Sequence, residues 1–543
     1  MEFRYAISLV YEAHLPFIRE YRKDDELSQS GEEGRFFNFV SESFLPLLET
    51  LNRLENDHIP FRLAIAVSPI LCHMLNDELL QKKYLHYIDK QIEFGRQELE
   101  RTADNIDLNN LVMNYYNRIT ENKIAYTEHY EKNLLKAIDF FRRKGKVEIL
   151  ASCATHAFMP FISHNHESMQ AQMEIPLTAY RRHFGGAPQG FWLPSFGWHS
   201  GLEPYLKAYN YSYTVLDSHG LLFGNPMPEK GCFYPAKTPN GTFILGRDLH
   251  AVREIRKYVT DTVYRNNERD AGYELPHEII GSFITEEGKR HETGYKYWSC
   301  AAPTGCAAPA GHADDRSGQN IYNNQAASAR VAEHAKAFLD NTAARLEEAS
   351  KYMEEIPISV NAYNAASFGH FWYEALQFIE TLFRLTAERS DLKFVCPSEY
   401  IFKQNLSSFQ TVNPEFSSSG VNGYAETWLD VSNDWIYRHL LRAMERMTEL
   451  AERFPDDTGL KERALNQAAR EILLAQSSDW PALLHEQNST EYAHKKAENS
   501  LRNFTTIYEA LGSNYISTEW LTTLERKHNI FPNINYRVFR RKK

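Results

Sequence analysis

The sequence predicts an α/β protein whose short parallel strands alternate with helices and close into a βα barrel. Two observations support this fold class. The first is a series of short apolar runs separated by helical stretches, which is typical of buried parallel strands. The second is the polar residue that follows most of these runs, because the top face of a βα barrel is built from side chains just beyond the strand ends. About seven or eight such runs are present, so a slightly irregular barrel fits.

The candidate strands are rich in apolar, β-branched and aromatic residues, as strands generally are. In chain order they are Ala6–Tyr11, Leu63–Val67, Val147–Ser152, Gly190–Leu193, Ser212–Leu216, Phe243–Leu245, Pro357–Val360 and Lys393–Val395. The polar side chains that follow them are, in the same order, His14, Ser68, His156, Ser195, Asp217, Asp248, Asn364 and Ser398. We expect these side chains to gather at one mouth of the barrel.

The helical stretches carry apolar residues at helical spacing. Between the strands they are Leu79–Arg101, Ile124–Arg143 and Ala326–Met353, and beyond residue 430 they are Trp435–Arg453, Leu460–Ala475, Ala493–Leu511 and Ser517–Lys527. No strand pattern interrupts the second group. We therefore expect a barrel over residues 1–400, with a flexible loop at about 300–320, and an α-helical domain over residues 401–543.

Composition and charge exclude several classes of protein. The formal net charge of −11 speaks against a nucleic-acid binder, because phosphate binding favours a basic surface. No run approaches the roughly 20 apolar residues of a membrane span, and the N-terminal segment lacks the basic lead of a signal peptide. The cysteines are few and scattered, and Cys300, Cys306 and His312 match no standard metal motif. We expect a cytoplasmic protein without a metal or another cofactor.

Four ordered segments carry a more specific signal. They are residues 12–17 (EAHLPF), 153–160 (CATHAFMP), 190–195 (GFWLPS) and 363–372 (YNAASFGHFW). Residues 217–220, 246–248, 292–297, 397–400 and 475–481 add weaker matches between and after them. Together they resemble glycoside hydrolase family 57, the group of α-glucan branching enzymes and α-amylases. The resemblance covers nearly the whole chain and implies an incomplete (β/α)7 barrel with a C-terminal α-helical domain.

The same resemblance shows both catalytic positions substituted. The family's nucleophile, a Glu, corresponds to Ser195, and its general acid/base, an Asp, corresponds to Asn364. Retaining glycoside hydrolysis needs two carboxyl groups roughly 5–5.5 Å apart, one to form the glycosyl ester and one to move the proton. A serine hydroxyl carries no charge, and an amide cannot donate and recover a proton near neutral pH. No carboxylate in the sequence is obviously placed to replace them.

Other pocket positions have drifted as well, which favours natural divergence over engineered inactivation. Glu12 stands where the family has a His, and Arg35 and Ser419 each stand where it has a Trp. The matching positions that remain, and would bind sugar, are His14, His156, Trp192, Asp248, Trp298 and Trp428, with Tyr234 near the acceptor. The alternatives are that the histidines are buried core residues, that the tryptophans only pack, and that Asp248 caps a helix or pairs with Arg247 or Arg253.

Three interpretations of function follow. In the first, the chain is a catalytically degenerate relative that binds α-1,4-glucan or maltooligosaccharide, or regulates or scaffolds active enzymes of glycogen metabolism. In the second, it is an active branching enzyme, amylase or glucanotransferase that uses displaced residues, including Ser195 served by His199. In the third, it is a structural partner without a sugar site. The oligomeric state stays open.

Overall fold

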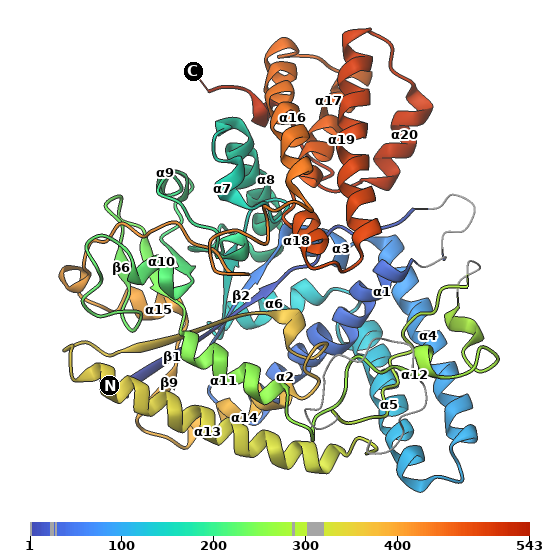
Figure 1. Cartoon of the computed structure of the whole chain (residues 1–543), viewed down its shortest axis with the longest axis vertical. Helices are drawn as coiled ribbons and strands as arrows, with labels where there is room; N and C mark the ends of the chain where they lie inside the picture. Colours follow the sequence, from blue (N-terminus) through green and yellow to red (C-terminus); the bar gives the residue numbers. More distant parts are fainter. Residues whose placement is uncertain (1–2, 22–26, 28–29, 285–287, 301–319, 543) are drawn as a thin grey trace.

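The centre of the molecule is a ring of parallel strands surrounded by helices (Figure 1). The computed structural model describes residues 3–21, 27, 30–284, 288–300 and 320–542. Its strands are β1 (Tyr5–Ala13), β2 (Leu63–Val67), β3 (Val147–Ala151), β4 (Gly190–Phe191), β5 (Tyr213–Leu216), β6 (Ala236–Lys237), β7 (Phe243–Gly246), β8 (Ile358–Asn364) and β9 (Leu392–Phe394). The predicted strands are thus confirmed, and β6 is an addition that pairs antiparallel with β7.

The ring follows the strand order β7-β5-β4-β3-β2-β1-β8, and neighbouring strands are parallel. It closes between β7 and β8 through a single parallel bridge, Arg247 to Val360, where the Asp248 N–H donates to the Val360 carbonyl at 2.8 Å. Strand β9 lies beside the start of β1. This is the incomplete (β/α)7 barrel that the sequence predicts.

Alternation along the strands decides which side chains enter the barrel. Val10, Val215, Leu245 and Ala362 belong to a cluster inside the ring, whereas Ile7, Leu9 and Tyr11 pack outward against helices. The residues two positions beyond the inward set therefore point into the barrel at its carboxyl-terminal end. These residues are Glu12, Asp217, Arg247 and Asn364, and they form the floor of what we call the mouth.

Helices cover the outer face of the ring and extend beyond it. They are α1 (Gly31–Asn38), α2 (Leu45–Asn56), α3 (Pro69–Leu75), α4 (Glu78–Arg101), α5 (Ile106–Ile124), α6 (Leu134–Arg143), α7 (Met159–Ile162), α8 (His166–Phe184), α9 (Glu203–Ala208), α10 (Ser218–Leu222), α11 (Leu249–Val259), α12 (Ala271–Glu274), α13 (Asn324–Ser350), α14 (Ala375–Ala387), α15 (Pro397–Ile401), α16 (Asp434–Arg453), α17 (Leu460–Ala475), α18 (Asp479–His485), α19 (Thr490–Gly512) and α20 (Thr518–Lys527). Among the described residues, no helix is both long and apolar enough to cross a membrane.

One predicted helix is wrong. The periodic stretch Ile124–Arg143 is broken, because Glu131 and Lys132 adopt positive φ angles of 50° and 63°. Asn133 then starts α6 afresh by accepting a hydrogen bond from the Lys136 N–H. The other predicted helices are confirmed with small shifts at their ends, as α4, α13, α16, α17, α19 and α20. The predicted loop at 300–320 lies almost wholly outside the described residues.

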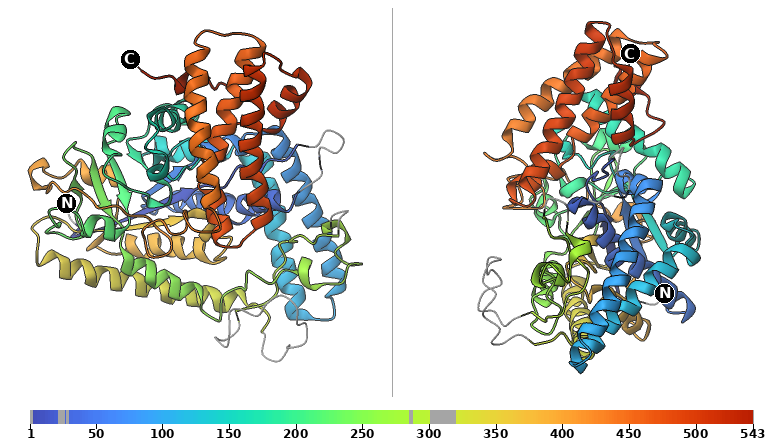
Figure 2. Two further views of the ribbon diagram at one scale, coloured as in Figure 1. Left: turned by 45° about the horizontal axis from the view of Figure 1, so that its top comes forward. Right: turned by 90° about the vertical axis from the view of Figure 1, so that its right-hand side faces the viewer.

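The C-terminal helices form a bundle at one end of the molecule (Figures 1 and 2). The turn between α17 and α18 joins this bundle to the barrel: Ala157 and Ser477 form an antiparallel bridge, and the Ser478 N–H donates to the His156 carbonyl at 3.1 Å. Residues 411–417 form bridges to segments beside β5 and β6. The domain boundary at residues 400 and 401 stays a prediction.

Candidate functional site

Two residues at predicted motif positions lie side by side at the mouth of the barrel. Glu12 on β1 and Asn364 on β8 are register partners at the ends of adjacent strands. Glu12 is 7% exposed, whereas Asn364 is open to solvent. The Asn364 side-chain oxygen accepts a hydrogen bond from the Ala366 N–H at 2.8 Å. The residue at the predicted acid/base position is therefore an amide at an open surface, with its oxygen already engaged.

Ser195 lies where the chain leaves β4. Its φ angle of 57° and the 53° of Phe196 fall in the left-handed region, which is costly for residues other than glycine. The Ser419 N–H and hydroxyl both donate to the Ser195 carbonyl, at 2.7 and 3.0 Å, and hold this turn in place. His199 does not serve Ser195: its Nδ1 accepts from the Gly201 N–H, and its Nε2 has no hydrogen-bond partner among the described residues.

An ion pair crosses the floor beside these residues. The Arg247 guanidinium donates to Asp217 at 3.4 Å, with Nε buried and unpartnered within the described chain, and its carbon lies 5.0 Å above the Phe196 ring. Burial disfavours the Arg247 cation and lowers its pKa, although Asp217 opposes this effect. The sequence signal for this pair is the shared inward parity of the two residues along their strands.

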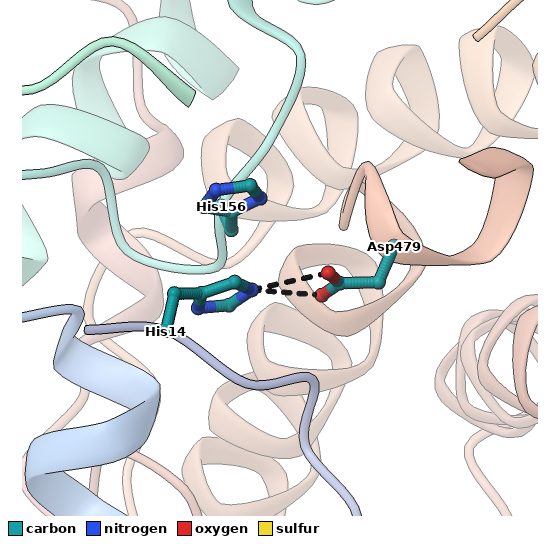
Figure 3. Close-up of side chains that lie close together, drawn as sticks. All are labelled: His14, His156 and Asp479. Atoms are coloured by element: carbon teal, nitrogen blue, oxygen red, sulfur yellow. Dashed lines mark hydrogen bonds and ion pairs between the residues drawn. The ribbon is translucent and has the colours of Figure 1, made fainter. Parts of the chain in front are cut away.

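His14 and His156 form a stacked pair at the other side of the mouth (Figure 3). The imidazole centroids are 3.8 Å apart and the rings are nearly parallel, at 6°. His14 bonds Ser68 through Nδ1 at 2.9 Å and both Asp479 oxygens through Nε2 at 3.1 Å. His156 bonds Ser478 through Nδ1 at 2.8 Å and Glu12 through Nε2 at 2.6 Å. Each ring is thus held between a serine and a carboxylate, in what we call the histidine clasp.

The electrostatics of the clasp follow from burial and charge pairing. Burial disfavours the His156 cation, but Glu12 and Asp479 outweigh that effect, so the pKa of His156 is raised above its usual range. Burial likewise disfavours the Asp479 anion, but His14 and His156 outweigh it, so the pKa of Asp479 is lowered. Glu12 therefore faces a histidine that holds its proton strongly and acts as its counter-ion.

His14, His156 and Asp479 are also the one trio of possible metal ligands found among the described residues, with donor atoms within 4.8 Å of one another. Their arrangement does not suit a metal ion. A metal binds an imidazole nitrogen along a lone pair that lies in the ring plane. Two parallel rings 3.8 Å apart have no common plane, so one ion cannot lie in the plane of both.

The predicted aromatic residues lie in different places. Trp192 is 2% exposed inside the barrel against Phe196, and Trp428 is 5% exposed and stacked on Phe158 at 4.9 Å. The Nε1 atoms of both have no hydrogen-bond partner in the described chain. Trp298 is half-buried, donates to Glu274 at 2.8 Å and lies 5.1 Å from the Arg269 guanidinium. None of these three rings presents an open face on the floor of the mouth.

Tyr234 and Asp248 are not brought together with the other predicted residues. Tyr234 is buried on Phe409, and its neighbour Phe233 accepts a hydrogen bond from the Ile358 N–H, at the amino-terminal end of β8. Asp248 caps α11, accepts from the Ser359 hydroxyl at 2.7 Å and pairs with Arg345 on α13. Its side chain points outward because the neighbouring Arg247 points inward. The capping alternative agrees with this contact, but the arginine partner is Arg345 and not Arg247 or Arg253.

Two exposed aromatic residues near the mouth were not predicted. Phe371, seven positions after Asn364, is 61% exposed, and its carbonyl accepts from the Asn267 amide. Tyr424 is 47% exposed, and the preceding Gly423 carbonyl bonds His219, which follows β5. The exposure of these two rings could not be predicted from the sequence, because the conformation of the surrounding loops determines it.

Comparison with known proteins identifies the family of the chain. The glycosyl hydrolase family 57 profile matches residues 8–251, and the profile of the 1,4-α-glucan branching enzyme C-terminal region matches residues 439–539. A 1,4-α-glucan branching enzyme of Thermococcus kodakarensis is 24% identical over 97% of this chain and 77% of its own length. The α-amylase AmyC of Thermotoga maritima is 32% identical, with a TM-score of 0.90 over the full length of both chains.

A branching enzyme of Pyrococcus horikoshii has the same fold, with a TM-score of 0.87 and 23% identity over 100% of this chain and 98% of its own. The profiles, the full-length relative at 32% identity and the barrel with its C-terminal helices agree with one another. The chain therefore belongs to glycosyl hydrolase family 57, among its branching-enzyme-like members.

Proposed function

We propose that this protein binds α-1,4-glucan at the barrel mouth without cleaving it, and acts by binding or regulation in α-glucan metabolism. The observation that carries the proposal is the state of the carboxylates at the mouth. Neither Ser195 nor Asn364 supplies one. Glu12 and Asp217, which do face the mouth, are held in ion pairs with His156 and Arg247. Association with active glucan enzymes and a cytoplasmic location are further parts of this proposal.

The pairing matters because it sets what each carboxylate can do. A general acid must hold a proton near neutral pH, and a nucleophile must be free to approach the sugar carbon. Glu12 is bound to the His156 imidazole at 2.6 Å. Asp217 is paired with the Arg247 guanidinium at 3.4 Å. In this arrangement neither carboxylate is free to approach a sugar carbon.

Binding a sugar requires fewer chemical groups than cleaving it, because no proton donor or nucleophile is needed. Carbohydrate sites combine apolar faces for the C–H surface with a few polar groups for the hydroxyls. The exposed rings of Phe371 and Tyr424 and the open Asn364 amide are groups of these kinds near the mouth. They favour glucan binding over the interpretation in which the protein has no sugar site.

A second candidate function rests on a specific placement. Glu12 on β1 and Asp217 on β5 point inward at the same end of the barrel, and β2, β3 and β4 separate their strands. Carboxylates on opposite sides of a site suit inverting hydrolysis, which uses a separation of roughly 6.5–9.5 Å. An active enzyme with these displaced residues would release products of inverted anomeric configuration, unlike a retaining enzyme.

The test combines binding and turnover on the same preparation. Maltoheptaose affinity is measured by calorimetry, and reducing ends, branch points and anomeric configuration are measured on maltoheptaose and amylose. We expect binding and no turnover. Because two stacking faces are lost, Phe371→Ala with Tyr424→Ala should weaken binding about tenfold. The matched control, Tyr352→Ala with Tyr515→Ala, removes two exposed rings away from the mouth and should leave affinity unchanged.

Each contrary result identifies an alternative. Turnover that disappears in Glu12→Gln or Asp217→Asn would establish the displaced-residue enzyme. Turnover that disappears in Ser195→Ala would make Ser195 catalytic. A folded protein without affinity for maltoheptaose or amylose would contradict the glucan-binding proposal.

A further inference from the structure

A second cavity lies at the opposite end of the barrel from the mouth. Its volume is about 570 Å³, and it is lined by residues that precede or begin β3 and β4 and by residues that follow β9. Parallel strands place their amino-terminal ends on one face, so Val147 and Gln189 open on the face away from Glu12 and Asn364. We call this cavity the N-terminal cleft.

The size and lining of the N-terminal cleft suit a small molecule. Sites for small ligands typically enclose about 300–1,000 Å³ and mix apolar walls with a few polar groups. The apolar part is formed by Val147, Ile149, Phe184 and Pro188. Gly185 and Gly186 complete one side, and a Cβ added at Gly186 would meet no atom within 4 Å. The cleft is therefore open space rather than a poorly packed seam.

The polar groups of the cleft are paired charges. The Arg62 Nε bonds Glu399 at 3.2 Å, with 32% and 27% of the two side chains exposed. The Arg142 Nε bonds Asp139 at 2.6 Å. An anion would meet the Glu148 and Glu399 carboxylates, and a cation would meet the two guanidinium groups. Such a lining favours a neutral ligand that both accepts and donates hydrogen bonds.

Glu148 connects the cleft to the barrel. It sits two positions before Leu150 on β3 and so shares its inward parity. Its oxygens accept from the Tyr213 hydroxyl of β5 at 2.7 Å and from the Ser398 N–H at 3.1 Å. Burial raises the pKa of this carboxyl, although both hydrogen bonds oppose the shift. A ligand hydroxyl in the cleft thus has a partly buried, firmly oriented oxygen acceptor.

We infer that the N-terminal cleft is a second carbohydrate site, which takes a short neutral saccharide such as glucose or maltose. The apolar lining would face sugar C–H groups, and the paired Arg62 and Glu399 would donate to and accept from neighbouring hydroxyls. The site does not depend on the proposed glucan binding at the mouth. Because active sites of such barrels lie at the carboxyl-terminal face, a ligand here binds without entering the mouth.

The experiment titrates wild type and variants with glucose and maltose by calorimetry, and locates the bound sugar by saturation-transfer NMR. Gly186→Trp fills the cleft without strain, because its backbone is not left-handed and its surroundings are open. Gly512→Trp at the end of α19 is the matched control, since its surroundings are equally open. We expect Gly186→Trp and Arg62→Met each to weaken maltose binding at least tenfold. Gly512→Trp and the Phe371→Ala, Tyr424→Ala double variant should keep wild-type maltose affinity for the cleft.

The outcomes separate the two sites. Maltose binding that survives Gly186→Trp but is lost in the Phe371→Ala, Tyr424→Ala variant would place the sugar at the mouth and overturn the second site. Absence of glucose and maltose binding to folded wild-type protein would overturn it too, while maltoheptaose binding would still decide the proposed function. Displacement of maltose from the cleft by inorganic phosphate, with tighter phosphate binding, would overturn the neutral-saccharide assignment.

Discussion

The two halves of the mouth hold their polar residues in very different ways. On the side of β1 and β3, His14 and His156 lie at motif positions and every ring nitrogen has a partner. On the side of β4 and β8, Ser195 and Asn364 stand at the two positions where the family resemblance implies carboxylates. The first half is buried against the C-terminal helices, whereas Asn364 is open to solvent.

This difference separates two constraints on an active site. Removing one member of a buried ion pair leaves the other charged and unpaired, which is strongly destabilising. Removing a solvent-exposed carboxylate costs the fold little. A substitution at an exposed position such as Asn364 should therefore cost less stability than one within the histidine clasp, which is buried and joins the barrel to the bundle. Four predictions sharpen this comparison.

The largest effect is expected from Glu12→Ala. The variant leaves His156 buried without its nearest counter-ion, and we expect the free energy of unfolding to fall by about 3 kcal/mol. Denaturant unfolding followed by circular dichroism measures it. Asn364→Ala, the register partner of Glu12 on the open side, is the control and should change stability by less than about 1 kcal/mol. Equal losses in the two variants would contradict the proposed difference between the halves.

A smaller effect is expected from pH, because only part of the clasp titrates. The raised pKa of His156 contributes stability that is fully present below its unfolded value of about 6.5 and is lost as pH rises through the folded value. The lowered pKa of Asp479 contributes stability present above its unfolded value of about 3.9 and lost as pH falls through the folded value. Both contributions are complete between about pH 4 and 6.5.

Melting temperatures of wild type and of His156→Gln with Asp479→Asn test this window. The difference between the two proteins should be greatest inside it and should shrink on both sides. Glu12 and His14 contact the titrating pair directly and each loses its charged partner in the variant, so the difference reports the charge pairing of the clasp as a whole. A difference that does not vary with pH would show that the clasp is held by packing rather than by charge.

Strand parity explains much of what the sequence could and could not predict. The strands and the positions of His14 and His156 followed from short apolar runs and their polar ends. Strand alternation also predicts that the Arg247 side chain points inward and that of Asp248 outward, whereas the family resemblance implies Asp248 as the pocket residue. The clasp partner Asp479 could not be derived, because it approaches His14 from 465 positions away through the packing of the C-terminal helices. The position of Tyr234 could not be derived for the same reason, since tertiary packing holds its loop beside the amino-terminal end of β8.

Ser195→Gly is expected to have a small effect of opposite sign. Glycine adopts the left-handed conformation of this turn without strain, although it loses more entropy on folding. We expect a net gain in the free energy of unfolding of about 0.5 kcal/mol. Ser152→Gly, at the end of β3 and without a positive φ, is the control and should be destabilising. A loss of stability in Ser195→Gly would mean that the serine hydroxyl supports the turn more than its backbone strains it.

The smallest effect is expected from placing carboxylates at the two predicted catalytic positions. Ser195→Glu with Asn364→Asp should show no hydrolysis or branching of amylose above wild type. The double variant places an Asp beside Glu12, its register partner, which brings two carboxylates together at the mouth. Ala366 and Ser419 would still differ from the family, and Ser419 still holds the Ser195 turn through two hydrogen bonds.

Adding Glu12→His removes the like charge, so activity that appears only in this triple variant would show that the closed half of the mouth also governs catalysis. Strong turnover by the double variant would show that the two carboxylates alone limit the activity.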